Sequence, residues 1–266
     1  MISRIDGEHF LGMMDYGVRN LSLYRDRVNA LNVFPVPDGD TGTNMVMTLE
    51  SGFKAIDGME GSLSELARRF AGAVILGARG NSGVIISQFF KGFSECFYDL
   101  EEADTVRFSY ALDTGVKCAY KAVSHPVEGT VLTVLREASE SVHNAVCNGE
   151  IETINALIDL FLDSANDSLR HTPDILPVLK SAGVVDSGGA GIIYVFDGIK
   201  KYLAGEELSK SSSTSSAQVI DYTKYDSHTK FEFGYCTELL IQLTDGSEDL
   251  EYNRFKARLE ALGSSA

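Results

Sequence analysis

The stretch NVFPVPDGDTGTN at residues 32–44 is a proline-stiffened, acidic loop that leads directly into an amphipathic segment, MVMTLESGFKAI at residues 45–56. Apolar residues return in that segment at three- and four-residue spacing, which predicts a helix over residues 41–56. A glycine-rich or acidic loop that opens a helix recurs further along the chain. We therefore expect helices to build the first two hundred residues.

The same periodicity predicts eight helices in residues 1–206, over 7–30, 41–56, 62–77, 82–99, 104–124, 129–148, 151–170 and 188–204. Clusters of Gly, Pro or Asp separate them, and no segment before residue 200 alternates as a strand would. The predicted fold class of this first domain is all-α.

The composition changes after residue 206. Residues 207–228 include a polar, serine-rich run that predicts a linker. Within residues 229–266, alternating aromatic and polar residues predict a strand over 231–242, and a short helix is expected over 253–262. One strand and one helix cannot complete a core, so we interpret residues 229–266 as the N-terminal fragment of an α+β middle domain.

The net charge of -15 argues against a nucleic-acid partner, because phosphate backbones are held by clustered Lys and Arg. No run reaches the roughly 18 to 20 apolar residues that a membrane span needs. The four cysteines form no CxxC pair and predict no disulfide framework. We therefore expect a cytoplasmic protein.

The acidic loop has the chemistry of a metal and phosphate site. Asp38 and Asp40 stand two residues apart, so in an extended loop both carboxylates project to one side and can bracket a hard cation such as Mg²⁺. Thr41, Thr43 and Asn44 follow where a helix begins, so free N–H groups and hydroxyls face an anion there. The alternative is a simple turn with a helix cap, or a single Ca²⁺ site, although the spacing excludes a Ca²⁺ loop of the EF-hand type.

Three further loops open predicted helices. They are GARGNSGVI at 77–85, with candidate ligand-binding residues Asn81, Ser82 and Gly83; HPVEGT at 125–130, with Gly129 and Thr130; and VVDSGGAG at 184–191, with Asp186, Gly188 and Gly189. Each alone is also explained by a tight helix crossing or a capped helix start. In an up-down helical assembly alternate connections lie at one end, so the loops could converge on one site. None has the P-loop or Rossmann form.

Together the stretches 32–45, 78–88, 125–130 and 185–191 resemble the nucleotide-binding domain of bacterial fatty acid kinase A, which is related to the nucleotide-binding subunit of dihydroxyacetone kinase. Residues 231–242 resemble the start of that family's middle domain. The resemblance implies an eight-helix antiparallel barrel that holds ATP through Mg²⁺, with Asp38 and Asp40 as catalytic metal ligands. The dihydroxyacetone kinase relative has a third aspartate upstream, where this chain has Asn32, whose amide oxygen would be the third ligand. Ser82 and Gly83 would face the phosphates, and Asp186 would line the nucleotide pocket.

The family's reaction transfers the γ-phosphoryl group of ATP to the carboxylate of a fatty acid held by a separate acyl-binding protein, giving an acyl phosphate. A carboxylate is already ionised near neutral pH, so no general base is required. Arg79 could neutralise transition-state charge, or else form a structural salt bridge. Cys236 is either a small core residue or, as the resemblance implies, part of a zinc site whose other ligands lie beyond residue 266.

Two alternative functions remain open from the sequence. One is a dihydroxyacetone-type kinase subunit, and the other is a module that binds ATP as a sensor without transferring phosphate. The oligomeric state is open, a homodimer included. For a kinase of the fatty acid type, we expect this chain alone to be inactive without its C-terminal part and its partner.

Overall fold

Helices make up nearly all of the regular structure in the computed structural model, which describes residues 2–208 and 252–261. The first part contains α1 Gly7–Leu23, α2 Arg25–Ala30, α3 Thr41–Lys54, α4 Leu63–Leu76, α5 Gly80–Glu95, α6 Thr105–Ala122, α7 Val131–Cys147, α8 Ile154–Ile175, α9 Pro177–Ala182 and α10 Ser187–Ala204. The predicted all-α class and antiparallel helical barrel are confirmed for this part of the chain.

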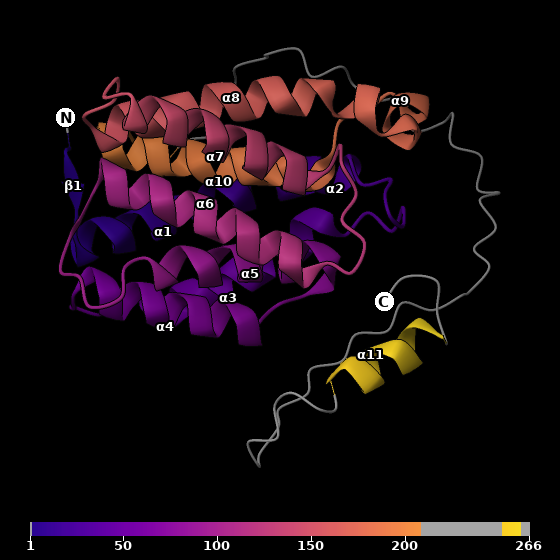
Figure 1. Ribbon diagram of the computed structural model, residues 1–266, viewed down its shortest axis with the longest axis horizontal. Coiled ribbons are helices and arrows are strands. Elements are labelled where there is room, and N and C mark those ends of the chain that lie inside the picture. Colours follow the sequence, from indigo (N-terminus) through magenta and orange to yellow (C-terminus); the bar gives the residue numbers. More distant parts are fainter. Residues whose placement is uncertain (1, 209–251, 262–266) are drawn as a thin grey trace. The chain divides into compact units, whose positions relative to one another are not determined.

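The long helices run alternately up and down (Figure 1). Helices α3, α5, α7 and α10 begin at the end where the short helices α2 and α9 lie. At the opposite end, the two-residue strands β1 Arg4–Ile5 and β2 Ala103–Asp104 pair antiparallel, with Arg4 opposite Asp104. Strands of two residues are too short to produce an alternating sequence pattern, so the sequence did not predict them.

Side-chain caps explain where many of these helices start. Asp6, Ser62, Asp104 and Thr153 each accept a hydrogen bond from the backbone N–H three residues later. Such a cap satisfies one of the free N–H groups in a helix's first turn and typically stabilises it by about 1 kcal/mol. Ser62 thus caps the helix that the sequence predicts over residues 62–77.

The helix predicted over 82–99 is observed as Gly80–Glu95, α9 was not predicted, and two further predicted helices differ for reasons that the structure shows. The helix expected over 7–30 is broken at Tyr24, whose ring stacks on Tyr194 of α10 at 4.3 Å between centroids. The helix expected to end near residue 170 continues to Ile175 through Pro173. The buried Thr172 anchors this added turn, because its Oγ1 accepts a hydrogen bond from the backbone N–H of Asp186 at 3.1 Å.

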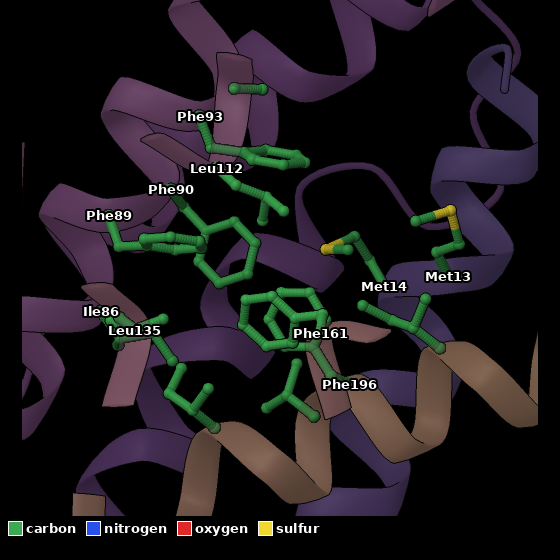
Figure 2. Packing of buried hydrophobic residues seen from close by; sticks show 14 of the residues in the cluster. Met13, Met14, Ile86, Phe89, Phe90, Phe93, Leu112, Leu135, Phe161 and Phe196 are labelled. Carbon is green, nitrogen blue, oxygen red and sulfur yellow. The ribbon is translucent and has the colours of Figure 1, made fainter. Parts of the chain in front are cut away.

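Aromatic and aliphatic side chains from α1, α5, α6, α7, α8 and α10 meet inside the barrel (Figure 2). Phe161 of α8 stacks on Phe196 of α10, with 3.9 Å between ring centroids. Phe89, Phe90 and Phe93 of α5 pack edge-on or offset against each other. The helices are therefore fixed along their length by the core, which leaves the loops at their ends available for binding.

None of the described helices is long and apolar enough to cross a membrane. Contacts divide the chain into two units, Met1–Ile220 and Asp221–Ala266. In the second, α11 spans Tyr252–Glu260, where a short helix was expected. The linker, the strand at 231–242 and Cys236 lie outside the described residues, so the domain boundaries at 206 and 228 and the zinc site remain predictions.

Candidate functional site

The loop between α2 and α3 carries the two aspartates. Asp38 is exposed and Asp40 is half-buried, and their carboxyl groups lie against each other. Burial, followed by the hydrogen bond and charge of Asp40, raises the pKa of Asp38 above its ordinary value. Gly39 between them has φ +68°, which glycine adopts without strain. Two acids in contact favour a bound cation, because the cation would relieve their mutual repulsion.

Asp40 occupies the N-cap position of α3, but its side chain caps no N–H group of that helix. This removes the helix-cap part of the alternative explanation for the acidic loop. Its carboxylate oxygens thus remain available to a metal ion. Of the residues that the structure describes, no group of three or more His, Cys, Asp or Glu side chains is arranged to hold a metal, so any third ligand here is of another type.

Asn32 lies at the centre of a hydrogen-bond chain behind the two aspartates. Its side-chain amide nitrogen donates to the backbone oxygen of Val36 at 2.6 Å and to Oδ1 of Asp38 at 3.2 Å. Its amide oxygen accepts from the hydroxyl of Thr41, which in turn accepts from the hydroxyl of Ser187 at 3.2 Å. Asn32 is therefore buried and oriented by its neighbours, and its oxygen is already hydrogen-bonded.

The first turn of α3 is fixed from outside the helix. Asn29 accepts a hydrogen bond from the N–H of Thr43 and donates one to its hydroxyl, each at 3.0 Å. Thr43 is half-buried by this pairing. Asn29 was not singled out from the sequence, because its role depends on a partner fourteen residues away.

The loop before α5 lies against α3. Gly80 has φ +59°, and a Cβ atom added there would lie 2.3 Å from Nδ2 of Asn44, so only glycine fits. The backbone N–H of Arg79 donates to the hydroxyl of the buried Thr48 at 3.0 Å. Gly83 also packs on this threonine.

The three residues predicted from this loop differ in their exposure. Asn81 is exposed, Ser82 is half-buried and Gly83 is buried. The side chains of Asn81 and Ser82 therefore lie at or near the surface at the start of α5. Gly83 contributes close packing of α5 on α3.

Asp186 joins the starts of α7 and α10. Its carboxylate accepts hydrogen bonds from the backbone N–H groups of Gly189, at 2.7 Å, and of Gly188 and Val131. Burial raises the pKa of Asp186 to about 6, although these hydrogen bonds oppose the shift. Cβ atoms added at Gly188 and Gly189 would lie 3.0 and 2.9 Å from side chains of α7, so the small residues allow the two helix starts to approach closely.

The loop before α7 is held by a charged network. The Glu128 carboxylate accepts hydrogen bonds from Tyr120, Thr133 and Arg136, at 2.9, 2.6 and 3.1 Å. Its neighbour Gly129 has φ +81° and donates its N–H to Thr133. The network fixes the 125–130 loop to both α6 and α7.

Thr130 is buried and occupies the N-cap position of α7. Its hydroxyl donates to the backbone oxygen of Val127 rather than capping the helix. Gly129 and Thr130 therefore lie behind the loop surface.

Contacts link all four predicted loops. The α3 and α10 starts meet through Thr41 and Ser187, and α10 meets α7 through Asp186. The α5 start meets α3 through Asn44 and Gly80. The adjoining carboxyl groups of Asp38 and Asp40, together with the glycines and helix N-termini at this end of the barrel, are suited to holding a cation with a polyanion.

Comparison with known proteins places this architecture in a family. Residues 35–201 match the model of the DAK2 domain family. The chain is 39% identical over 271 residues to an uncharacterized protein of Staphylococcus saprophyticus, and 37% identical to counterparts in Staphylococcus epidermidis and Staphylococcus aureus. Each alignment covers 100% of this chain and 49% of the relative, so the chain spans about half the length of these proteins.

The fold is also found in solved structures. Dihydroxyacetone kinase from C. freundii, in complex with AMP-PNP and Mg²⁺, matches with a TM-score of 0.57 at 19% identity, over 76% of this chain and 35% of that one. Its native form matches with a TM-score of 0.52 at 17% identity. The segment that matches the family model begins in the acidic loop and extends into α10. It contains all four loops of the site, apart from the first residues of the acidic loop. This chain belongs to the DAK2 domain family.

Proposed function

We propose that this chain binds ATP together with Mg²⁺ and serves as the nucleotide-binding part of a kinase. The observation that carries the proposal is the pair of adjoining carboxyl groups of Asp38 and Asp40, neither of which caps α3. The C. freundii structure with AMP-PNP and Mg²⁺ supports it, because about a third of that protein has the fold of this chain.

Asp38 and Asp40 would hold the metal, and the amide oxygen of Asn32 is the third candidate ligand. Bound Mg²⁺ supplies charge neutralisation and alignment of the phosphates. For Asn32 to bind it, the amide oxygen must release or share the Thr41 hydroxyl. Residues Thr41, Thr43, Asn44, Ser82 and Gly83 would surround the phosphates, and the loops at 125–130 and 186–189 would contribute to the nucleotide pocket.

For the acceptor, we propose the carboxylate of a fatty acid held by a separate acyl-binding protein. An oxygen of the carboxylate forms a bond to the γ-phosphorus, the bond from that phosphorus to the bridging oxygen breaks, and ADP leaves with an acyl phosphate as the second product. No proton must be removed. The four loops suit this chemistry, since their only histidine is the exposed His125, Asp38 and Asp40 are the proposed metal ligands, and Glu128 and Asp186 are hydrogen-bonded within the fold.

A dihydroxyacetone-type acceptor is the second candidate, favoured by the likeness to the C. freundii kinase. Its hydroxyl nucleophile would have to lose a proton, so this acceptor would need a general base. The two acceptors are separated by assaying the full-length protein with each. Hydroxylamine traps an acyl phosphate as a hydroxamate, and we expect this product only with the fatty-acid-loaded partner.

Nucleotide binding is tested on this chain by calorimetry with ATP and Mg²⁺. Asp38→Asn and Asp40→Asn should each weaken binding at least about tenfold, because each removes a charged metal ligand. Asp57→Asn, at an exposed position near the other end of α3, is the matched control and should bind as the wild type does. Binding that survives both loop substitutions would refute the metal site.

A further inference from the structure

Arg79 is the only lysine or arginine in the four loops at 32–44, 77–85, 125–130 and 184–191. The whole chain has 38 acidic against 23 basic residues. Arg79 therefore supplies the only Lys or Arg charge in the four loops of a chain whose net charge is -15.

The backbone of Arg79 is fixed next to the first turns of α3. Its N–H is bonded to Thr48, and the following Gly80 packs directly on Asn44. Asn44 itself donates its backbone N–H to the backbone oxygen of Asp40. Arg79 is thus connected to the aspartate loop through three short contacts, and its position does not depend on its own side chain.

The guanidinium group of Arg79 is bonded to its own loop. It donates a hydrogen bond to the backbone oxygen of the adjacent Ala78, at 3.1 Å, and the side chain is exposed. In contrast, carboxylates within 4.0 Å neutralise Arg19, Arg69 and Arg136. No described carboxylate pairs with Arg79, which removes the structural salt bridge as an explanation for it within residues 2–208 and 252–261.

In the proposed reaction, two Mg²⁺ ions would not neutralise all of the negative charge, so a guanidinium group near the phosphates would be useful. ATP carries about four negative charges, the two loop aspartates add two, and a carboxylate acceptor adds one more, while two Mg²⁺ ions would return only about four positive charges. In phosphoryl transfer an arginine commonly offsets the remaining charge on the transferring group. The planar guanidinium can donate two parallel hydrogen bonds to phosphoryl oxygens.

We propose that Arg79 is a catalytic residue that contacts the transferring phosphoryl group. This inference rests on the proposed function. Because the contact strengthens as charge develops during transfer, Arg79 contributes to turnover more than to ATP binding.

The test uses the full-length protein with its acyl-loaded partner, and compares wild type with Arg79→Gln, Arg79→Lys and Arg79→Ala. Arg68→Gln is the matched control, since Arg68 of α4 is also exposed and forms no ion pair with a described carboxylate. Thermal melting confirms that each variant is folded. We expect kcat to fall at least about 100-fold in Arg79→Gln, with the calorimetric Kd for ATP and Mg²⁺ changed less than about fivefold. Lysine should restore part of kcat, and added methylguanidine should raise turnover in Arg79→Ala.

Two results are distinguished by the design. If wild type and Arg68→Gln turn over and Arg79→Gln retains kcat within about threefold, the inference is overturned while the proposed function stands. The inference is also overturned, and the proposed function stands, if Arg79→Gln raises the Kd for ATP and leaves kcat unchanged. If the wild type itself fails to bind ATP and Mg²⁺, the proposed function is overturned and the inference with it.

Discussion

Replacing Asp186 with asparagine should remove a pH-dependent part of the protein's stability. The folded protein holds this carboxyl group in the contact between α7 and α10, with a pKa of about 6 against an ordinary value of 3.8. Because the folded pKa is raised, the native state binds the proton more tightly than the unfolded state does. The associated stability is fully present below about pH 3.8 and is lost as the pH rises through about 6.

The two pKa values set the size of the effect. Their difference corresponds to about 3 kcal/mol between the low-pH and high-pH limits. Between about pH 7.5 and about pH 5, the wild type should gain roughly 1.4 kcal/mol from this group. Asparagine does not titrate in this range, so the variant should lack this gain. The unfolding free energy of the wild type minus that of the variant should therefore be larger at about pH 5 than at about pH 7.5, by roughly 1.4 kcal/mol.

Urea denaturation at the two pH values, without Mg²⁺ or nucleotide, measures this difference. Other titrating groups are common to both proteins and cancel in the comparison. Asp57→Asn serves as the control for exchanging an exposed aspartate. A wild-type-minus-variant difference that is constant within about 0.3 kcal/mol across the two pH values would refute the buried, proton-binding Asp186.

Three further substitutions or conditions test the site. Burial and the neighbouring Asp40 raise the pKa of Asp38, so the affinity for Mg²⁺ with ATP should fall as the pH is lowered through that raised pKa. Calorimetry over a pH series measures this change. An affinity that stays constant over the series would contradict the prediction. Glu128→Gln should lower the free energy of unfolding by no more than about 1 kcal/mol, because the ion pair of Glu128 with Arg136 is partly exposed. The same substitution should weaken ATP binding severalfold, because it loosens the 125–130 loop. Unchanged affinity for ATP in calorimetry would argue against a role of that loop in binding. Gly80→Ala should lower the free energy of unfolding by roughly 1–3 kcal/mol, measured by chemical denaturation, and should also weaken ATP binding. The control is Gly72→Ala, whose added Cβ would have nothing within 4 Å and which should be neutral or stabilise the protein by up to about 1 kcal/mol. Equal effects of the two substitutions would disprove the close contact at Gly80.

The helices were predictable because their signals are local. Apolar residues at helical spacing and cap residues such as Ser62 act within a few positions of each other, so the sequence alone locates them. The break at Tyr24 was not predictable, since its stacking partner Tyr194 is 170 residues away. The continuation of α8 through Pro173 likewise depends on Thr172 and the backbone of Asp186.

The residues of the candidate site also fall into those that the sequence predicts and those that it does not. The residues proposed to contact a ligand, such as Asp38 and Ser82, lie in glycine-rich or acidic loops that can be recognised in the sequence. Residues that position those loops, such as Asn29, Thr48 and Thr172, look like ordinary polar positions on helices. Their signal is a polar residue where the helical pattern requires a buried one, and Thr48 and Thr172 are fully buried in the structure.

The most direct test of the proposed ATP site is a crystal structure of this chain with Mn²⁺ and a nonhydrolysable ATP analogue, in which anomalous scattering locates the metal. We expect a Mn²⁺ peak within about 2.2 Å of carboxylate oxygens of both Asp38 and Asp40, with the analogue's phosphates at the start of α3. A metal or nucleotide bound elsewhere, with no metal ion at the two aspartates, would contradict the account.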